Sequence, residues 1–332
     1  MKAVIWTKYG PPDGLQLHEV ETPVPKENEV LIKIHAAAVS RADTEFRRLI
    51  LPFLYAIPVR LYLGVLRPTR IKILGSEFAG EIVAAGKAVT QYQTGDQVYG
   101  YTGLGMGTYA EYMCLGEKPS ALLGVMSKRP TDITYEEAAA VPFGGLEALH
   151  SLDRANIQRG QKVLIVGAGG SIGTYSVQLA KHYGAEVTGV DSGGKLEMLR
   201  SIGADHVIDY TREDYTKNGQ NYDVIIDTIG GSPFAGSVRS LTENGTYLNV
   251  NPRWHHRLQM GWSKGKSNKK LLFWEGSYTT RNLLRLKEMV EAGVIKPVID
   301  RVYPLEQIAE AHRYVETDQK KGNVAITMRS EG

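Results

Sequence analysis

Cysteine is almost absent from this chain, since Cys114 is the only one in 332 residues. A single thiol forms no intrachain disulfide, and it excludes every metal site that is built from several cysteines. Long uninterrupted apolar segments are lacking too, because the most apolar N-terminal run, residues 49–66, contains Pro52, Pro58 and Arg60. A membrane-spanning helix would not normally carry that combination. We therefore expect no membrane partner, and we interpret the run as an apolar helical flap over a binding cleft.

An excess of one charge sign is missing as well. The chain has 39 lysine and arginine residues against 36 aspartate and glutamate residues, which gives a formal net charge of +3. So even a balance gives no argument for binding nucleic acid or an anionic membrane surface. No charged-then-apolar leader precedes the strand-like residues 2–6, which predicts a cytoplasmic protein. The length favours two domains.

Residues 161–191 carry the most informative pattern, QKVLIVGAGGSIGTYSVQLAKHYGAEVTGVD. Residues 163–166 are apolar and mostly β-branched, as is typical of a strand buried on both faces of a parallel sheet. A glycine-rich turn follows, and then apolar residues at helical spacing that end at Gly184. A second apolar strand ends at Asp191. This order predicts a βαβ unit.

The turn of this unit is suited to a dinucleotide. Glycines let the backbone turn tightly and approach a ligand, and the helix that follows directs its free N–H groups and the positive end of its dipole at a pyrophosphate. Asp191 lies about 20 residues beyond the turn, where a carboxylate accepts a hydrogen bond from a ribose hydroxyl. The predicted cofactor-binding turn consists of Gly167, Gly169, Gly170, Ser171, Ile172 and Gly173.

Two kinds of pattern divide the chain. Residues 1–125 contain short strand-like segments punctuated by proline and glycine, which predicts a mostly β domain. Residues 126–289 alternate strand-like and helix-like segments, which predicts a doubly wound parallel sheet. Residues 290–332 are expected to return to the first domain and complete it. The expected fold class is therefore α/β, with a discontinuous catalytic domain and a nucleotide-binding domain.

Several motifs taken together resemble one known family. They are LGSEFAGEIVAAG, TGDQVYG, TYAEY, EEAAAVPFGGLEALH, the glycine turn and SIGADHVIDY, and the likeness covers nearly the whole chain. The sequence is similar to the zinc-independent quinone oxidoreductase branch of the medium-chain dehydrogenase/reductase superfamily. This resemblance implies a GroES-like catalytic domain, a Rossmann domain, a homodimer, and hydride transfer from NAD(P)H to a quinone or an α,β-unsaturated carbonyl.

The positions of the metal ligands differ from those of the zinc enzymes in this superfamily. In zinc alcohol dehydrogenases the catalytic metal lies on a cysteine after the AAAV-like strand and on a histidine in a Gly-His-Glu triplet. Here the matching residues are Ser40 in AVSRAD and Ser76 in LGSE. Neutral hydroxyls are poor zinc ligands, so we expect no metal. A quinone or enone spreads the negative charge that follows hydride transfer, so weaker hydrogen-bond donors suffice.

The proton donor is the least defined part of the predicted site. Family members often place a tyrosine or an asparagine just after the AAAV strand, and this chain has neither, so Ser40 is the positional substitute. Tyr55 and Tyr62 in the apolar run, and Tyr99 or Tyr101 after the TGDQ turn, are alternative donors. Each tyrosine has packing as its simpler interpretation.

Further residues are expected near the nicotinamide because the family has functional residues there. Glu147 stands where the family commonly carries a threonine, and it is either a proton relay with a pKa raised by burial or a solvent-facing side chain. Gly230 in DTIGG and Asn249 lie in segments expected to meet the nicotinamide end. Asn323 in KGNVAI resembles a polar residue near the cofactor in the family.

The motifs that select the cofactor disagree. Asp191 favours NADH, because a carboxylate binds a free 2′-hydroxyl and repels a 2′-phosphate. Lys195 and Tyr210 match the lysine and tyrosine that hold the 2′-phosphate in quinone oxidoreductases. The alternative is that Lys195 lies in solvent and Tyr210 merely packs. We favour NADP(H), with NAD(H) as the second option.

Three functions fit these patterns. The first is an NAD(P)H-dependent reductase of a small-molecule quinone or enone that works without zinc. The second is a non-catalytic NAD(P)H-binding or sensor protein, since it requires the same turn. The third is a metal-free alcohol dehydrogenase. The first two both require the cofactor turn, and of these two the missing proton donor weakens only the first.

Overall fold

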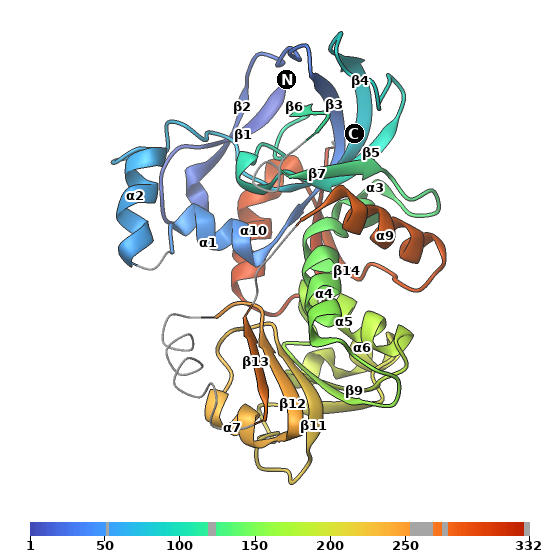
Figure 1. Cartoon of the computed structure of the whole chain (residues 1–332). Coiled ribbons are helices and arrows are strands. Elements are labelled where there is room, and N and C mark those ends of the chain that lie inside the picture. Colours follow the sequence, from blue (N-terminus) through green and yellow to red (C-terminus); the bar gives the residue numbers. More distant parts are fainter. Residues whose placement is uncertain (51–52, 119–123, 253–267, 274–277, 329–332) are drawn as a thin grey trace. The chain divides into compact units, whose positions relative to one another are not determined.

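The computed structural model describes residues 1–50, 53–118, 124–252, 268–273 and 278–328, without the side chains of residues 53–56 (Figure 1). The chain forms two compact units. Unit 1 contains residues 1–143, 278–291 and 297–332, and unit 2 contains residues 144–277 and 292–296. Residues 126–143, which the sequence pattern placed with the nucleotide-binding domain, therefore belong to unit 1.

Unit 1 is organised around a seven-stranded sheet (Figure 1). Six strands follow the order β14-β15-β3-β4-β5-β7, and β6 pairs with β3. The bounds are β3 (Glu29–Val39), β4 (Glu77–Ala85), β5 (Gln97–Tyr101), β6 (Tyr112–Gly116), β7 (Val125–Lys128), β14 (Ile299–Pro304) and β15 (Asn323–Thr327). Only β14 and β15 pair in parallel among these neighbours. A separate antiparallel ladder joins β1 (Lys2–Trp6) and β2 (Leu15–Glu19).

The long strand β3 contributes to two hydrophobic clusters. Val30 and Ile32 pack in one cluster with residues of β4 and β5. Ala37 and Val39 belong to a second cluster, which also contains Trp6. The two-residue period places successive side chains on opposite faces of the sheet, so one strand supplies both. This packing fixes the carboxyl end of β3, where Ser40 follows.

Local sequence determines where the helices of unit 1 begin. Ser40 and Asp43 form a capping box at the start of α1 (Arg41–Arg48), and Thr134 and Glu137 do so for α3 (Tyr135–Ala139). The side chain of each N-cap residue accepts from the third backbone N–H, which would otherwise have no helical partner. The remaining helices are α2 (Phe53–Leu63), α9 (Thr280–Glu291) and α10 (Ile308–Glu316).

Unit 2 contains a six-stranded sheet whose strands are all parallel. Their order is β10-β9-β8-β11-β12-β13, with bounds β8 (Lys162–Val166), β9 (Glu186–Asp191), β10 (His206–Asp209), β11 (Tyr222–Asp227), β12 (Leu241–Asn249) and β13 (Lys270–Phe273). The order reverses direction between β8 and β11, as in dinucleotide-binding sheets. The helices are α4 (Pro142–Ala155), α5 (Ser171–His182), α6 (Leu196–Ser201) and α7 (Phe234–Arg239). The predicted doubly wound sheet is confirmed.

Two details of unit 2 differ from the sequence-based expectation. The apolar periodicity predicts a helix over residues 174–183, whereas α5 begins at Ser171, three residues earlier, because Gly170 serves as its N-cap. Strand β13 was not predicted, since KLLF is too short and too weakly patterned to separate from a loop. Among the helices of the described ranges, none has the length and apolar character needed to cross a bilayer.

Candidate functional site

The glycine turn of unit 2 brings the backbone into close self-contact. Gly167 has φ +76°, a conformation that favours glycine, and it leaves the end of β8. A Cβ added at Gly173 would lie 2.5 Å from the carbonyl oxygen of Ala168. Gly170 caps α5 without any side-chain hydrogen bond. The first N–H groups of α5 therefore face the turn without a side-chain cap, which is the arrangement that binds a phosphate.

The carboxylate of Asp191 lies beside this turn and is held by several donors. One oxygen accepts from the backbone N–H of Gly169 at 2.8 Å. The other accepts from the N–H of Ser192 at 2.8 Å and lies 3.1 Å from the ammonium nitrogen of Lys195. Asp191 and Lys195 are 6% and 7% exposed. Lys195 therefore does not lie in solvent, and its cation offsets the charge of Asp191 next to the glycine turn.

Tyr210 lies at the same edge of the sheet. Its backbone N–H donates to the carbonyl of Asp191 at 3.2 Å, directly after β10 ends. Its side chain is 61% exposed, so it does not pack in the core. The three residues that the sequence placed in conflict, Asp191, Lys195 and Tyr210, are thus neighbours at the carboxyl ends of β9 and β10.

A second polar network forms at the carboxyl end of β11. The fully buried Asp227 accepts from the backbone N–H groups of Ile229 and Gly230, at 3.0 and 2.9 Å. It also accepts from the hydroxyl of Tyr247 at 2.8 Å. The amide nitrogen of Asn249 lies 3.3 Å from that hydroxyl. Asn249 therefore helps to shape the loop that contains Gly230, where φ is +64°.

The organising role of Asp227 was missed at the sequence level, where it was only the first residue of a segment. An acid at the end of a buried strand, followed by a glycine pair, is the signal that could have identified it, because such a carboxylate commonly accepts backbone N–H groups of the next turn. Taken together, these features of unit 2 fit a dinucleotide. They provide a tight glycine cradle, an uncapped helix end and polar side chains at the carboxyl edge.

In unit 1 the two serines at the metal-ligand positions are brought together by one carboxylate. The hydroxyl of Ser40 donates to Oδ2 of Asp43 at 2.6 Å, and the hydroxyl of Ser76 donates to Oδ1 at 3.2 Å. The backbone N–H of Ser40 also reaches Oδ2, at 2.8 Å. Ser40, Ser76 and Asp43 are 5%, 4% and 1% exposed. Both serines could be identified from the sequence. Asp43, the acid that joins them, was missed, although its spacing from Ser40 is that of a capping box.

A second buried acid follows Ser76. Glu77 accepts from the backbone N–H of Phe143 at 2.8 Å and is 2% exposed. Burial raises the pKa of Glu77 well above its usual range, and the nearby charge of Asp43 raises it further. Burial also raises the pKa of Asp43, while the hydrogen bonds from Ser40 and Ser76 act in the opposite direction. Unit 1 thus contains two adjacent buried carboxyl groups whose protonated forms are favoured.

The tyrosines expected as alternative donors have different surroundings. Tyr99 is fully buried and donates its hydroxyl to the carbonyl of Leu283 at 2.9 Å, so packing explains it better than proton donation. The centre of the Tyr101 ring lies 5.6 Å from that of Phe143, in a tilted contact, and 5.0 Å from that of Tyr278, edge to face. Tyr62 on α2 is 57% exposed. The side chain of Tyr55 lies outside the described residues.

Glu147 and Asn323 lie on different units. Glu147 is 3% exposed on α4, so the solvent-facing alternative is wrong. Near the start of the same helix, a Cβ at Gly144 would lie 3.0 Å from the ring of Tyr175 on α5. Glu147 therefore belongs to the helix that packs on α5, which follows the glycine turn. Asn323 begins β15 in unit 1, where its amide donates to the carbonyl of Val298 at 3.1 Å.

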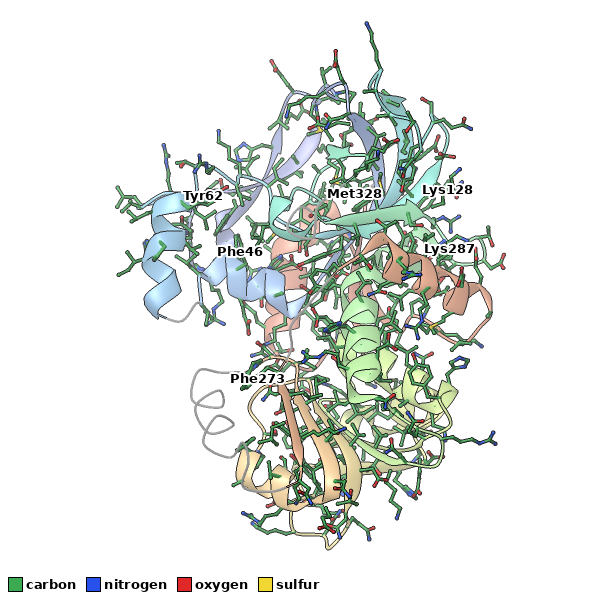
Figure 2. The ribbon with its side chains drawn as sticks, viewed as in Figure 1. Phe46, Tyr62, Lys128, Phe273, Lys287 and Met328 are labelled. Atoms are coloured by element: carbon green, nitrogen blue, oxygen red, sulfur yellow. The ribbon has the colours of Figure 1, made fainter. Side chains whose placement is uncertain are left out.

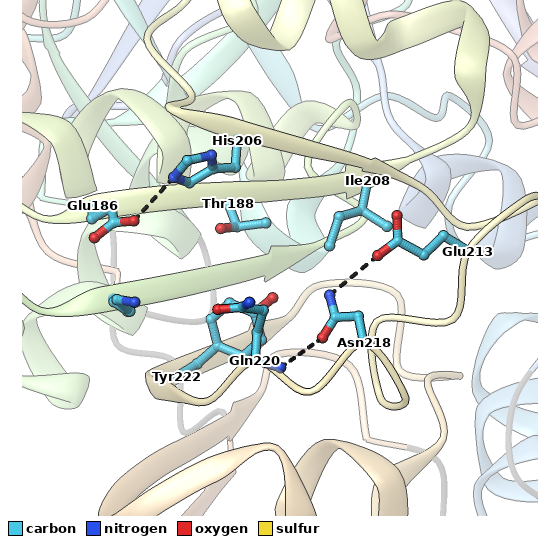
Figure 3. A pocket seen from close by; sticks show the side chains of 9 residues that line it. Glu186, Thr188, His206, Ile208, Glu213, Asn218, Gln220 and Tyr222 are labelled. Carbon is cyan, nitrogen blue, oxygen red and sulfur yellow. Dashed lines mark hydrogen bonds and ion pairs between the residues drawn. The ribbon is translucent and has the colours of Figure 1, made fainter.

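A cavity in unit 2 lies at the opposite edge of the sheet from the glycine turn. Figure 3 shows residues that line it, among them Glu186 and His206, which pair at 3.0 Å where β9 and β10 begin. Its position at the amino ends of the strands separates it from the cofactor residues. Across the described ranges, no three histidine, cysteine, aspartate or glutamate side chains are grouped so as to hold a metal ion.

Comparison with known proteins supports the interpretation that unit 2 fits a dinucleotide. Residues 26–123 match the alcohol dehydrogenase GroES-like domain, and residues 202–326 match the zinc-binding dehydrogenase domain. The 2-methylene-furan-3-one reductase of Solanum lycopersicum is 33% identical over 98% of this chain and 79% of its own length. The chloroplastic NADPH-dependent alkenal/one oxidoreductase of Arabidopsis thaliana is 30% identical over the same shares of the two chains. The quinone oxidoreductase structure from Coxiella burnetii superposes with a TM-score of 0.87, at 28% identity and 99% coverage of both chains.

Proposed function

The chain belongs to the medium-chain dehydrogenase/reductase family, in its quinone oxidoreductase branch, and we propose that it reduces a quinone or an α,β-unsaturated carbonyl with NADPH and without a metal ion. The observation that carries the proposal is the hydrogen-bonded set Ser40, Asp43 and Ser76. The names of the relatives support the reaction class, since they include enone reductases and a quinone oxidoreductase.

The donor set in unit 1 argues against a catalytic zinc. Zinc in catalytic sites is bound by thiolate, imidazole and carboxylate ligands, whereas this set offers two neutral hydroxyls. Both hydroxyls already donate to Asp43, so their protons are directed at the carboxylate. Of the three groups, Asp43 alone has the chemistry of a good ligand, and one carboxylate holds zinc weakly. We therefore assign hydrogen bonding, in place of Lewis-acid catalysis, to this part of unit 1.

The residues of unit 2 are suited to hold the nicotinamide cofactor, which would supply the hydride when bound. The glycine turn and the start of α5 would receive the pyrophosphate. Lys195 and the exposed Tyr210 would hold a 2′-phosphate, while Asp191 keeps Lys195 beside the turn at 3.1 Å. In this assignment Asp191 positions a cation and a backbone N–H, so its negative charge is offset and no longer excludes NADPH.

Proton delivery is assigned to Ser40. Its hydroxyl lies 2.6 Å from Asp43, whose pKa is raised by burial. When Asp43 is protonated, its O–H would donate to the Ser40 oxygen while the Ser40 hydroxyl gives its own proton to the substrate, and a proton from solvent would then restore the Asp43 carboxyl group. This relay of two residues would replace the tyrosine or asparagine of other family members. Glu147 on α4 is the second candidate for a relay, because it is also buried.

The reaction is tested with purified protein that has been dialysed against a chelator. We expect NADPH oxidation with simple quinones or enones, at a rate that is unchanged by the dialysis, and metal analysis should find less than one zinc per chain. Tight NADPH binding without turnover across the panel would support a sensor instead. Loss of turnover on dialysis, restored by zinc, would contradict the metal-free assignment.

Cofactor choice is tested with Lys195→Gln. A charge-assisted hydrogen bond is worth roughly 1.5–3 kcal/mol, so kcat/KM for NADPH should fall by about 10- to 150-fold. The value for NADH should change much less, because a free 2′-hydroxyl does not need the cation. Asp191→Asn is the companion variant, since it removes the charge and keeps an acceptor for Gly169. If Lys195→Gln lowers both values equally, Lys195 supports the fold of the turn and does not select the cofactor.

A further inference from the structure

Helix α2 and the turn after it expose a group of large apolar side chains. Ile57 is 52% exposed, Leu61 66%, Tyr62 57%, Val65 56% and Leu66 88%. We call these five residues the α2 patch. A single exposed apolar residue is ordinary, but a contiguous group marks a surface that binds something. Figure 2 shows Tyr62 on α2, at the outer side of unit 1.

The backbone under the α2 patch is well tied to unit 1. Leu63 is 1% exposed and belongs to the hydrophobic cluster that contains Trp6. Val59 packs against that cluster. The backbone N–H groups of Thr69 and Arg70 donate to the carbonyl of Leu63 at 2.8 and 3.3 Å, which folds the turn back onto the end of the helix. A helix that is apolar on both faces needs apolar surroundings on both, and the core of unit 1 covers one.

Basic side chains surround the α2 patch. Residues 46–76 contain no aspartate or glutamate at all. Arg60, Arg67, Arg70 and Lys72 are exposed within this stretch. The guanidinium of Arg70 lies 4.4 Å from the centre of the Tyr62 ring, so cation and apolar surface are in direct contact. The balanced charge of the whole chain conceals this local concentration.

The positive charge beside the α2 patch distinguishes between three kinds of partner: a second copy of the chain, a neutral apolar surface and an anionic bilayer. A symmetric contact with a second copy would bring the same patch against itself and oppose its four cations to one another. A neutral apolar partner would leave the cations without counter-charges. An anionic bilayer surface provides an apolar layer for the patch and phosphates for the cations, and interfacial helices combine residues of these kinds.

We propose that the α2 patch binds the surface of an anionic lipid bilayer, which replaces the expectation of no membrane partner that the whole-chain charge and the interrupted apolar run suggested. Its apolar side chains enter the boundary between headgroups and acyl chains, and Arg60, Arg67, Arg70 and Lys72 lie near the lipid phosphates. Helix α2 has 11 residues, about half of what a span requires, so it lies along the surface. The proposal does not depend on the reaction that the protein catalyses.

The test is co-sedimentation of the full chain with vesicles of phosphatidylcholine alone or with added phosphatidylserine. We expect binding to the anionic vesicles that weakens with salt. Arg67→Gln/Lys72→Gln should weaken it by about fivefold per charge, since each basic residue near such a surface contributes about that factor. Leu61→Ser/Leu66→Ser should weaken it as well, without changing the salt dependence.

Matched controls lie elsewhere on unit 1. Leu284 is 44% exposed and Lys87 is exposed, so Leu284→Ser and Lys87→Gln change the same side-chain types outside the patch and should leave binding unchanged. Thermal unfolding checks that every variant is folded. Equal sedimentation with both vesicle types, or none with either, would overturn the proposal. A dimer that Leu61→Ser/Leu66→Ser dissociates, in protein that does not bind vesicles, would overturn it in favour of a second copy.

Discussion

The glycine turn of unit 2 and the serine pair of unit 1 are built in different ways. In the turn the backbone itself forms the surface, and a Cβ at Gly173 would meet main-chain atoms. In the serine pair the arrangement depends on side chains that converge on Asp43. The glycine turn tolerates almost no change of residue type, whereas the serine pair depends on one central acceptor, Asp43. Their variants should therefore fail in different assays.

The largest effect on cofactor affinity is expected from Gly173→Ala. The added methyl would lie 2.5 Å from the oxygen of Ala168, and a main-chain atom has little freedom to move away. Overpacking of this kind costs about 1–3 kcal/mol, and a turn displaced by that strain should bind NADPH roughly 10- to 100-fold more weakly. The measurement is a titration of cofactor fluorescence, with urea unfolding to report stability.

The matched control is Gly194→Ala. Gly194 lies close to Lys195 in the same unit, and a Cβ there would meet no atom within 4 Å. Cofactor affinity and unfolding midpoint should both stay near the wild-type values. If Gly173→Ala bound NADPH as tightly as Gly194→Ala, the close backbone contacts of the turn would not be required for the ligand, and the contrast between the two regions would fail.

The same contrast explains how much of the fold could be predicted. The elements of unit 2 follow from periodicity, because apolar strands buried on both faces and helices that end at glycine leave clear signals. The pattern of residues 206–209 predicts a strand, and β10 has those bounds. Strand β13 was not predicted, because its own pattern is short. Pairing between distant segments depends on tertiary contacts that local periodicity does not contain.

The site could be predicted to a similar extent, and for a similar reason. Asp191, Lys195 and Tyr210 were identified from their positions, yet only the structure shows that Lys195 pairs with Asp191. Ser40 and Ser76 were found by comparison with a family pattern. Asp43 was missed because its function depends on the approach of Ser76 from β4, 33 residues later. Hydrogen bonds across such separations have no local signature.

The largest effect on stability, as distinct from cofactor affinity, is expected from Asp43→Ala. It would leave the hydroxyls of Ser40 and Ser76, and one backbone N–H, without their shared acceptor in a buried place. Each unsatisfied buried group costs about 1–3 kcal/mol, and the capping box of α1 is lost as well. We expect a clear decrease in the unfolding midpoint in urea, with little change in NADPH affinity.

Asp43→Asn separates the acceptor from the charge. The amide oxygen continues to accept one hydrogen bond, so the variant should lose less stability than Asp43→Ala. Its turnover should nevertheless fall, because an amide does not return a proton to Ser40. Wild-type turnover in Asp43→Asn would remove the relay, and a loss of NADPH affinity equal to that of Gly173→Ala would show that the two regions are not separate in function.

The smallest effect in acid is expected from Glu77→Gln, whose effect on stability depends on pH. Burial raises the pKa of Glu77 in the folded protein well above its usual value of 4.5. The unfolded chain therefore releases this proton at lower pH than the folded chain does. Wild-type stability contributed by Glu77 falls as pH rises above 4.5 and through the folded pKa. Glutamine keeps an acceptor for the N–H of Phe143 and does not ionise.

The stability difference between Glu77→Gln and the wild type should thus be near zero in acid and grow in favour of the variant as pH rises. Glu291→Gln is a control of opposite sign, because the hydrogen bond from Lys287 lowers the pKa of Glu291. Its stability should match the wild type in acid, fall below it as pH rises from the lowered folded pKa to 4.5, and stay below it at higher pH. Urea unfolding across a pH series measures both. A flat difference for Glu77→Gln would mean that its carboxyl group ionises as it does in water, and that burial in this region of unit 1 does not raise its pKa.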